Sequence, residues 1–218
     1  MKDYTVKSID TFQTKEWFLK KHYAKRMPPI SYCFGLFDIN NILKGVISFG
    51  DCGGSSNSHN LIKGYKINEL NRLCVNEGLE KNVLSFFVSK SLKLLPKPMA
   101  IISYADTTYG HHGYIYQATN WIYCGKTGTD VNLVKGSEVL HRKSFYDRFG
   151  SSSYSEFKKQ GYEIVKSLEK HRYFIFLGNK KDIRNMKSKL TYKILPYPKG
   201  DNKRYNADYS PTVQQSLF

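Results

Sequence analysis

The sequence predicts a mixed α/β fold, a central β-sheet flanked by helices, with a basic C-terminal extension. An apparent strand–helix–strand unit over residues 67–105 follows an antiparallel hairpin, which favours a layered α/β domain over a helix bundle or a β-sandwich. The 218 residues suffice for one full-sized domain with its own core. Because 40% of the residues are hydrophobic and 15% are aromatic, general disorder is excluded.

The first element is expected to be a short amphipathic helix over residues 11–21. Its apolar residues lie at positions 12, 17 and 18, behind a candidate N-cap at Thr11. Two prolines at 28 and 29 prevent the helix from continuing. The runs YCFGLFDI and LKGVISFG then flank Asn40-Asn41, a pattern typical of a β-hairpin. The Gly/Ser-rich stretch 51–60 indicates a loop.

The central unit is the clearest part of the pattern. Residues 67–75 alternate as a strand does, and residues 83–95 place apolar side chains on one face of a helix. Pro96 and Pro98 end that helix, and the apolar run 99–105 reads as a buried strand. These elements predict a strand–helix–strand unit.

The second half alternates shorter elements. HGYIYQATN predicts a helical turn or short helix, WIYCG a strand, and VNLVKGSEVLHRK a hairpin around Lys135-Gly136. Residues 144–160 and 179–190 are expected to be helical, and 173–177 to be the final strand. From Pro196 onward the chain lacks apolar periodicity. We therefore expect one domain over residues 1–195 and an irregular basic tail over 196–218.

Several classes of protein are excluded at this stage. No run of 18 apolar residues exists, so no membrane span or membrane partner is expected. The polar N-terminus MKDYTVKSID does not resemble a signal peptide. Four widely spaced cysteines without a CxxC pair indicate reduced thiols rather than a zinc cluster. The expected location is the cytoplasm.

The formal charge of +16 is concentrated toward the C-terminus. Residues 142–218 hold 17 Lys/Arg and 7 Asp/Glu, a net +10, whereas residues 1–141 hold 17 and 11, a net +6. The cations alternate with Tyr and Phe, a mixture that suits phosphates and bases. A solvated basic surface explains the composition about equally well.

Two polar-aromatic clusters contain the candidate catalytic residues. In YADTTYGHHGYIYQATNWIYCG, Asp106 ends a buried strand and Tyr116 follows ten positions later. His22 and Tyr23 stand together in HYAKRMP. If folding brings these four residues together, they offer nitrogen, phenolate and carboxylate ligands, a set suited to iron. The alternative is that the aromatic residues only pack in the core.

A third segment suits an anionic ligand. In ELNRLCVNEGLEKNVLSFFVSK a strand and a turn lead into a helix whose first N–H groups can face a phosphate. The segment contains neither a Walker sequence nor GxGxxG, so the pattern alone has low specificity.

These segments resemble the Mom family of phage DNA-modification proteins, which belong to the GNAT acyltransferase-like superfamily. The similarity rests on WFLKKHYAKRMP, ELNRLCV and SYADTTYGHHGYIYQATNWIYCG, with weaker matches in HRYFIFLGNKK and LPYPKG, and spans most of residues 17–200. It implies a transferase that converts adenine in DNA to a carbamoylmethyl derivative and protects the DNA from restriction. It also implies a GNAT-like sheet in which strands 67–75 and 99–105 separate around the donor.

The resemblance implies roles for individual residues. The implied catalytic residues are His22, Tyr23, Arg72, Asp106 and Tyr116, of which all but Arg72 also form the implied iron site. The donor, an acyl-CoA or an aminoacyl group, is expected against Ser103, Arg72, Gly78, Lys81 and Asn82. Of the spaced glycines in the usual GNAT pyrophosphate signature, only Gly78 is present.

The implied partner is double-stranded DNA, whose target base must leave the helix before its amine can react. Tyr109, Tyr114 and Trp121 are candidates to stack on that base. Cations in the C-terminal third are expected to hold the phosphates, namely Lys180, Lys181, Arg184 and Lys187.

The last five residues, QQSLF, resemble the pentapeptide that binds bacterial sliding clamps. Gln214 is the expected anchor, and Leu217 and Phe218 the apolar pair. The alternative is a tail that folds back on the domain.

Two other functions remain open from the sequence. One is a DNA-binding module of the same fold without activity. The other is an ordinary GNAT N-acyltransferase acting on a protein or a small amine, which would not need the basic tail.

Overall fold

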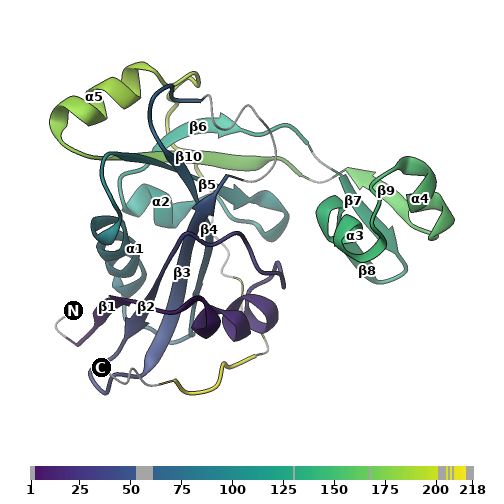
Figure 1. Cartoon of the computed structure of the whole chain (residues 1–218), viewed down its shortest axis with the longest axis horizontal. Helices are drawn as coiled ribbons and strands as arrows, with labels where there is room; N and C mark the ends of the chain where they lie inside the picture. The colour runs from purple at the N-terminus through teal and green to yellow at the C-terminus, as the bar shows by residue number, and fades with distance from the viewer. Residues whose placement is uncertain are drawn as a thin grey trace.

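A seven-stranded mixed sheet forms the main body of the protein, and a three-stranded sheet with two helices forms a separate small lobe (Figure 1). The computed structural model describes residues 3–52, 61–129, 131–166, 168–200, 205, 207 and 209–214. Most of the expected Gly/Ser-rich loop (53–60), together with Leu217 and Phe218, lies outside the described residues. The predicted α/β class, a large mixed sheet flanked by helices, is confirmed.

The strands of the main sheet follow the order β1-β2-β3-β4-β5-β10-β6. They are β1 (Thr5–Ser8), β2 (Tyr32–Phe37), β3 (Leu43–Asp51), β4 (Ile67–Val75), β5 (Met99–Asp106), β6 (Ile122–Lys126) and β10 (Lys170–Leu177). Every neighbouring pair is antiparallel except β4 and β5, which are parallel and are connected by a helix. Two parallel strands need such a crossover connection, because a hairpin turn reverses the chain direction and therefore joins only antiparallel strands.

Helices cover both faces of this sheet. They are α1 (Val83–Leu94), α2 (Tyr114–Ala118) and α5 (Lys180–Ser188), with the short turns η1 (Thr11–Thr14), η2 (Trp17–Lys21) and η4 (Thr107–Tyr109). On one face α1 buries Phe87, Val88 and Leu92 against the strands, with Tyr116 of α2 in the same cluster. On the other face α5 contributes Met186 and η2 contributes Trp17 and Phe18 to two separate clusters.

The small lobe is the segment 131–166. It consists of β7 (Val131–Lys135), β8 (Glu138–His141), α3 (Arg142–Phe149), α4 (Tyr154–Lys159) and β9 (Glu163–Lys166). Its core is independent of the main sheet and is built from Leu133, Phe145, Phe157 and Tyr162. The lobe is inserted between β6 and β10 and projects to one side of the main body (Figure 1).

The structure differs from the sequence prediction in several elements. Residues 11–21 do not form one helix capped by Thr11: a 3₁₀ turn begins after Asp10, whose side chain accepts from Phe12 N, and residues 17–21 are π-helical. Residues 144–160 form two helices because Gly150 adopts a left-handed φ of +69° and ends α3. Strands β1 and β9 were not predicted, since each has four residues and neither is an alternating apolar run.

Gly113 precedes α2 in a conformation and a space that only glycine fits. Its φ is +78°, and an added Cβ would lie 2.3 Å from the Tyr173 ring. Gly113→Ala is therefore expected to lower the free energy of unfolding by roughly 2–4 kcal/mol, from overpacking and left-handed strain together. Denaturant unfolding measures this. Gly128→Ala, where a Cβ meets nothing within 4 Å, is the matched control; equal midpoints for both variants would contradict the close packing.

Candidate functional site

A cavity of about 840 Å³ opens where β4 and β5 separate, within the size range of small-molecule sites. The two strands pair only from Ile67–Ala100 to Glu69–Ile102 and then diverge. This confirms the expectation that strands 67–75 and 99–105 separate. Most of the predicted catalytic and donor-binding residues line the cavity: His22, Tyr23, Arg72, Gly78, Lys81, Asn82, Asp106 and Tyr116.

Asp106 ends β5 and is positioned by two contacts. Its Oδ1 accepts from Thr108 N at 3.0 Å, which caps the turn η4, and its Oδ2 lies 3.2 Å from Lys170 Nζ on the paired strand β10. Only about 12% of the Asp106 side chain is exposed. The carboxylate is therefore held at the cavity wall with a cation beside it.

His22 is the residue after η2 and is buried with a fixed hydrogen bond. The backbone N–H of Ala24 donates to His22 Nδ1 at 3.1 Å, so the ring proton is on Nε2. Burial, together with the charges of Arg72 and His111, lowers the pKa of His22 to about 3. His22 is thus a neutral imidazole that offers an N–H donor.

Tyr116, which lines the cavity, forms a buried polar pair with Ser103, which lies behind it. Ser103 Oγ lies 2.7 Å from Tyr116 Oη and 2.7 Å from the Leu70 carbonyl oxygen. Ser103 is almost completely buried and does not line the cavity, so it positions Tyr116 rather than facing a ligand. Burial raises the pKa of Tyr116 to about 12, so its hydroxyl stays protonated at neutral pH.

Glu69 was not a sequence-based candidate, but it lines the same cavity. It lies on β4 at the last paired position before the strands separate. Burial raises the pKa of Glu69 to about 7, although Arg72 and Lys170 act to lower it. A carboxyl group with this pKa is partly ionised at neutral pH and can accept a proton. The available sequence signal was that Glu69 is the one acidic residue of this predicted strand.

The four residues proposed as iron ligands lie around one cavity, but they do not fit an iron site as they stand. His22 Nδ1 already accepts a backbone hydrogen bond, and Nε2 holds the proton. Burial raises the pKa of both Tyr23 and Tyr116, which disfavours phenolate ligands. Across the described ranges, no group of three or more His, Cys, Asp or Glu side chains is arranged to hold a metal ion.

Aromatic rings gather at one side of the cavity. The Tyr23 ring is 4.3 Å from Tyr109 and 5.7 Å from Tyr205 of the tail, and the His22 ring is 4.2 Å from Tyr23 (centroid distances). Tyr109 is 38% exposed, which leaves part of its ring for a ligand. Tyr114 also lines the cavity and is exposed.

Five of the expected DNA-contacting residues, Trp121 and four cations, are not placed at this cavity. Trp121 is fully buried, with its ring 5.0 Å from Tyr116, so the prediction that it stacks on a base is wrong. The cations Lys180, Lys181, Arg184 and Lys187 lie on α5, which begins beyond Leu177 at the far end of β10. Lys170, which lies beside Asp106, stands seven residues before Leu177 on β10. About 23 Å of strand therefore separates Asp106 from the end of β10 that leads into α5.

The described part of the tail contacts the main body instead of extending away from it. Tyr209 and Thr212 hydrogen-bond to Glu16, and Lys21 Nζ donates to the Tyr209 carbonyl oxygen at 3.1 Å. Leu43 N donates to the carbonyl oxygen of Gln214 at 2.8 Å. Tyr205 and Ala207 line the cavity. The tail therefore forms part of the cavity wall.

Comparison with known proteins identifies the family of this chain. The Mom protein family matches residues 3–199. The chain belongs to the Mom family. It is 26% identical over 210 residues to the methylcarbamoylase mom of Escherichia phage Mu, covering 91% of this chain and 85% of that protein. The match includes every cavity residue named above except those of the tail.

Among solved structures, this Mom family member is similar to a mutant of spermidine N-acetyltransferase SpeG from Vibrio cholerae. The TM-score is 0.46 at 7% identity, covering 81% of this chain and 95% of that one. None of the helices in the described part of the chain has the length and apolar character that a membrane span needs.

Proposed function

We propose that this Mom family protein modifies the exocyclic amine of adenine in DNA and adds a carbamoylmethyl group. The observation that carries the proposal is the convergence of Glu69, Arg72, Asp106 and Tyr116 on one cavity in a chain that matches this family over residues 3–199. The similarity to a phage methylcarbamoylase supports the identity of the transferred group.

The acceptor amine needs assistance from a base. The lone pair of the adenine N6 amine is delocalised into the ring, so the amine is a poor nucleophile. Forming the N6–CH2 bond breaks an N6–H bond, whose proton passes to a base, and the bond from the CH2 carbon to its leaving group on the donor, which departs with the electron pair. Four carboxyl groups line the cavity; because Glu77 is paired with Lys21 and Glu80 is exposed, Asp106 and Glu69 are the two best placed to accept this proton.

The hydrogen-bond donors in the cavity, both neutral and cationic, have a role that complements that of the carboxyl groups. His22 presents Nε2–H, and Tyr116 presents a protonated hydroxyl. Arg72 adds a buried guanidinium whose Nε has no hydrogen-bond partner among the described residues. These groups are suited to bind oxygen atoms of the donor and to stabilise negative charge that develops there. None of these steps uses iron.

The proposed donor is an acyl-CoA or an aminoacyl compound that carries a leaving group on its CH2 carbon, because attack of N6 on the acyl carbon itself would give an amide instead of the N6–CH2 bond. Gly78, Lys81 and Asn82 line the cavity at the turn before α1. Gly78 has φ +74°, and an added Cβ would meet nothing within 4 Å, so the backbone there is open to a ligand. Lys81 supplies positive charge, and the start of α1 supplies N–H groups for an anionic part of the donor.

The acceptor is an adenine turned out of the duplex. Its N6 amine lies within the base pair, so the base must leave the stack to enter the cavity. Tyr114, which is exposed and lines the cavity, and Tyr109, which is partly exposed next to Tyr23, are the candidates to stack on this base. Stacking of this kind is worth about 1–3 kcal/mol per base.

Mass spectrometry of nucleosides from cells that express the chain tests the proposal. We expect a deoxyadenosine that carries one carbamoylmethyl group, and DNA that resists restriction enzymes cutting at the modified sites. Unmodified nucleosides with retained DNA binding would instead favour a DNA-binding module without activity. Acetylated protein or polyamine would favour an ordinary N-acyltransferase.

The C-terminal pentapeptide is proposed to bind the bacterial sliding clamp. We expect Leu217→Ala/Phe218→Ala to abolish binding of the purified clamp, because a Leu-Phe pair in an apolar pocket supplies most of the affinity of such a peptide. Val213→Ala is the control, because Val213 is 69% exposed and precedes the motif. Fluorescence polarisation of the labelled protein measures the affinity. Equal affinity of the double variant and the wild type, or a wild type that does not bind, would refute clamp binding.

A further inference from the structure

The small lobe has no part in forming the cavity, and the chemistry proposed above does not use it. None of its residues lines the cavity between β4 and β5. Its core is tightly packed: the Phe145 ring lies 4.9 Å from Phe157 and 5.3 Å from Tyr162 (centroid distances). It is therefore an independently packed unit that holds its surface residues in fixed positions.

Helix α3 of the lobe has two different faces. Phe145 and Phe149, four residues apart, point into the lobe core. Arg142, Lys143 and Tyr146 lie on other sides of the helix and are exposed. Residues three and four apart share a helix face, so Tyr146 lies beside both cations. This face presents two cations and a phenol to its surroundings, together with the exposed Asp147, four residues after Lys143.

Of the two helices of the lobe, α3 lies nearer the main body and α4 lies on the far side (Figure 1). The lobe is attached through β6 and β10, and β10 begins at Lys170, the partner of Asp106. Burial raises the pKa of Glu69, and four cations act to lower it; Arg72 has the largest of these opposing effects and Lys143 the smallest.

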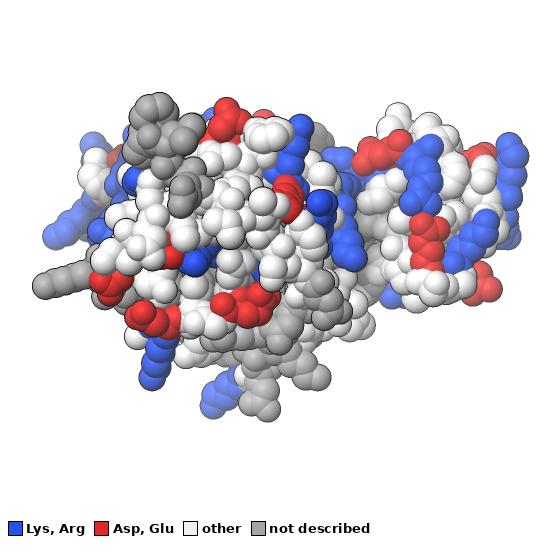
Figure 2. All heavy atoms as spheres, turned by 90° about the horizontal axis from the view of Figure 1, so that it is seen from below, with Lys and Arg blue, Asp and Glu red and all other residues white. Residues whose placement is uncertain are grey.

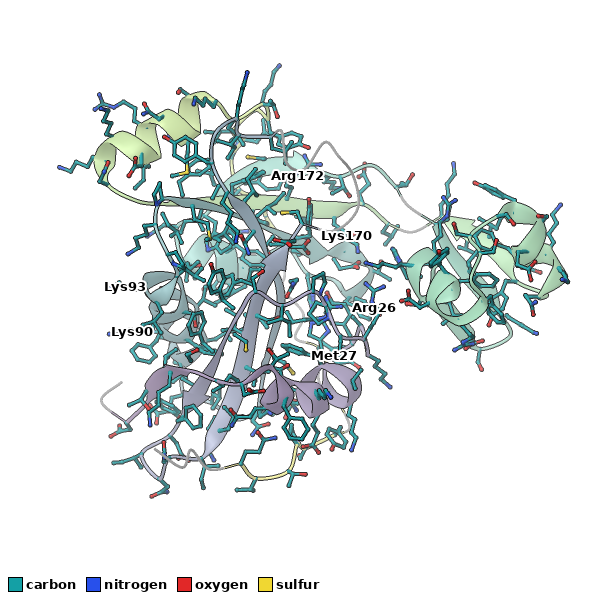
Figure 3. All side chains as sticks on the ribbon, viewed as in Figure 1. Arg26, Met27, Lys90, Lys93, Lys170 and Arg172 are labelled. Atoms are coloured by element: carbon teal, nitrogen blue, oxygen red, sulfur yellow. The ribbon has the colours of Figure 1, made fainter. Side chains whose placement is uncertain are left out.

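The main body also presents cations toward the lobe. Arg26 and Lys170 lie on the side of the main body next to the lobe (Figure 3). Arg26 Nη1 is buried and has no hydrogen-bond partner among the described residues. Cations therefore stand on both sides of the approach to the cavity.

The lobe itself has an excess of positive charge. Segment 131–166 holds seven Lys/Arg and four Asp/Glu, a net +3. Two of the four acids are already paired within the lobe, Glu138 with Arg148 and Glu156 with Lys159. Figure 2 shows Lys and Arg side chains projecting from the lobe, with acidic residues among them.

We propose that the α3 face of the small lobe, Arg142, Lys143 and Tyr146, binds the sugar-phosphate backbone of the DNA that delivers its adenine to the cavity. Lysine and arginine hold phosphates by charge, and tyrosine hydroxyls donate to phosphate oxygens. Lys170, whose side chain is 38% exposed, adds a cation on the other side. This inference rests on the proposed function, because it assumes that DNA is the substrate.

Charge reversal at Lys143 tests the proposal in the full-length protein. Lys143 is exposed and makes no ion pair among the described residues, so Lys143→Glu preserves the lobe core. We expect weaker binding of duplex DNA, equally for all sequences, and a slope of log K against log salt that is smaller by about 1. Lys158→Glu on α4, the same charge change on the far side of the lobe, is the matched control and is expected to bind like the wild type.

The outcomes separate this proposal from the proposed function. If Lys143→Glu lowers both DNA affinity and modification while Lys158→Glu changes neither, the lobe face is a DNA contact. If Lys143→Glu retains wild-type affinity and salt slope while the wild type modifies adenine, the lobe proposal is wrong and the function stands. If the wild type binds DNA through Lys143 without modifying it, the function is wrong and the lobe contact stands. Thermal unfolding confirms that both variants are folded.

Discussion

Asp106→Asn is expected to lower the rate of adenine modification by about 10²–10⁴-fold, the usual contribution of a positioned proton acceptor. The amide keeps an oxygen that can accept from Thr108 N, so the turn η4 is preserved. It removes the negative charge that faces Lys170 and the ability to accept a proton. Single-turnover assays with duplex DNA and nucleoside mass spectrometry measure the rate.

The control for Asp106→Asn is the same type of change away from the cavity. Glu163→Gln on β9 removes an exposed carboxylate in the small lobe and is expected to retain the wild-type rate. DNA affinity is expected to be similar for Asp106→Asn and the wild type. Full activity of Asp106→Asn would show that Asp106 takes no part in the reaction.

Glu69→Gln is expected to change the pH dependence of the reaction as well as its rate. Because burial raises the pKa of Glu69 to about 7, the ionised base becomes available as the pH rises through 7, and wild-type activity is expected to rise over that range. Glutamine cannot ionise, so this rise disappears and the rate falls by about 10²-fold or more. A pH profile of single-turnover rates between pH 5.5 and 8.5, a span of about one and a half units on either side of that pKa, measures both effects.

Stability provides the control for Glu69→Gln. A carboxyl group with a raised pKa in the folded state binds its proton more tightly there than in the unfolded chain. Its contribution to stability is therefore present at low pH and is lost as the pH rises from about 4.5 through 7. The glutamine variant lacks this loss and is expected to be no less stable than the wild type above pH 7. A variant that is inactive because it is unfolded would contradict this account, as would an unchanged pH profile.

The central part of the fold was predictable because its pattern is local and strong. The helix over 83–95 and the strands over 67–75 and 99–105 have clear apolar periodicity, and prolines fix the end of the helix. Asp106 was recognisable as the polar end of a buried strand. The hairpin at Asn40-Asn41 was predictable because Asn41 tolerates the left-handed conformation that it adopts.

The remaining features depend on contacts between distant parts of the chain. Trp121 stands beside the candidate site in sequence, but packing against Tyr116 turns it into the core. Glu69 differs from other strand acids only because the divergence of β4 and β5 places it in a buried cavity. The hairpin at Lys135-Gly136 was predicted, but its separation into a lobe was not, because periodicity does not reveal which strands share a sheet. The hydrogen bond that fixes His22 is likewise invisible in the sequence.

The most direct test of this account follows the amine nitrogen of one adenine. A duplex that carries ¹⁵N at the N6 position of a single adenine is incubated with the purified protein and a cell extract that supplies the donor. The nucleosides are then fragmented in the mass spectrometer. We predict that the ¹⁵N atom is found in the fragment that carries the carbamoylmethyl group and that Asp106→Asn forms this product about 10²–10⁴-fold more slowly than the wild type. A modification on any other atom or base, or formation of the product by Asp106→Asn at the wild-type rate, would contradict the account.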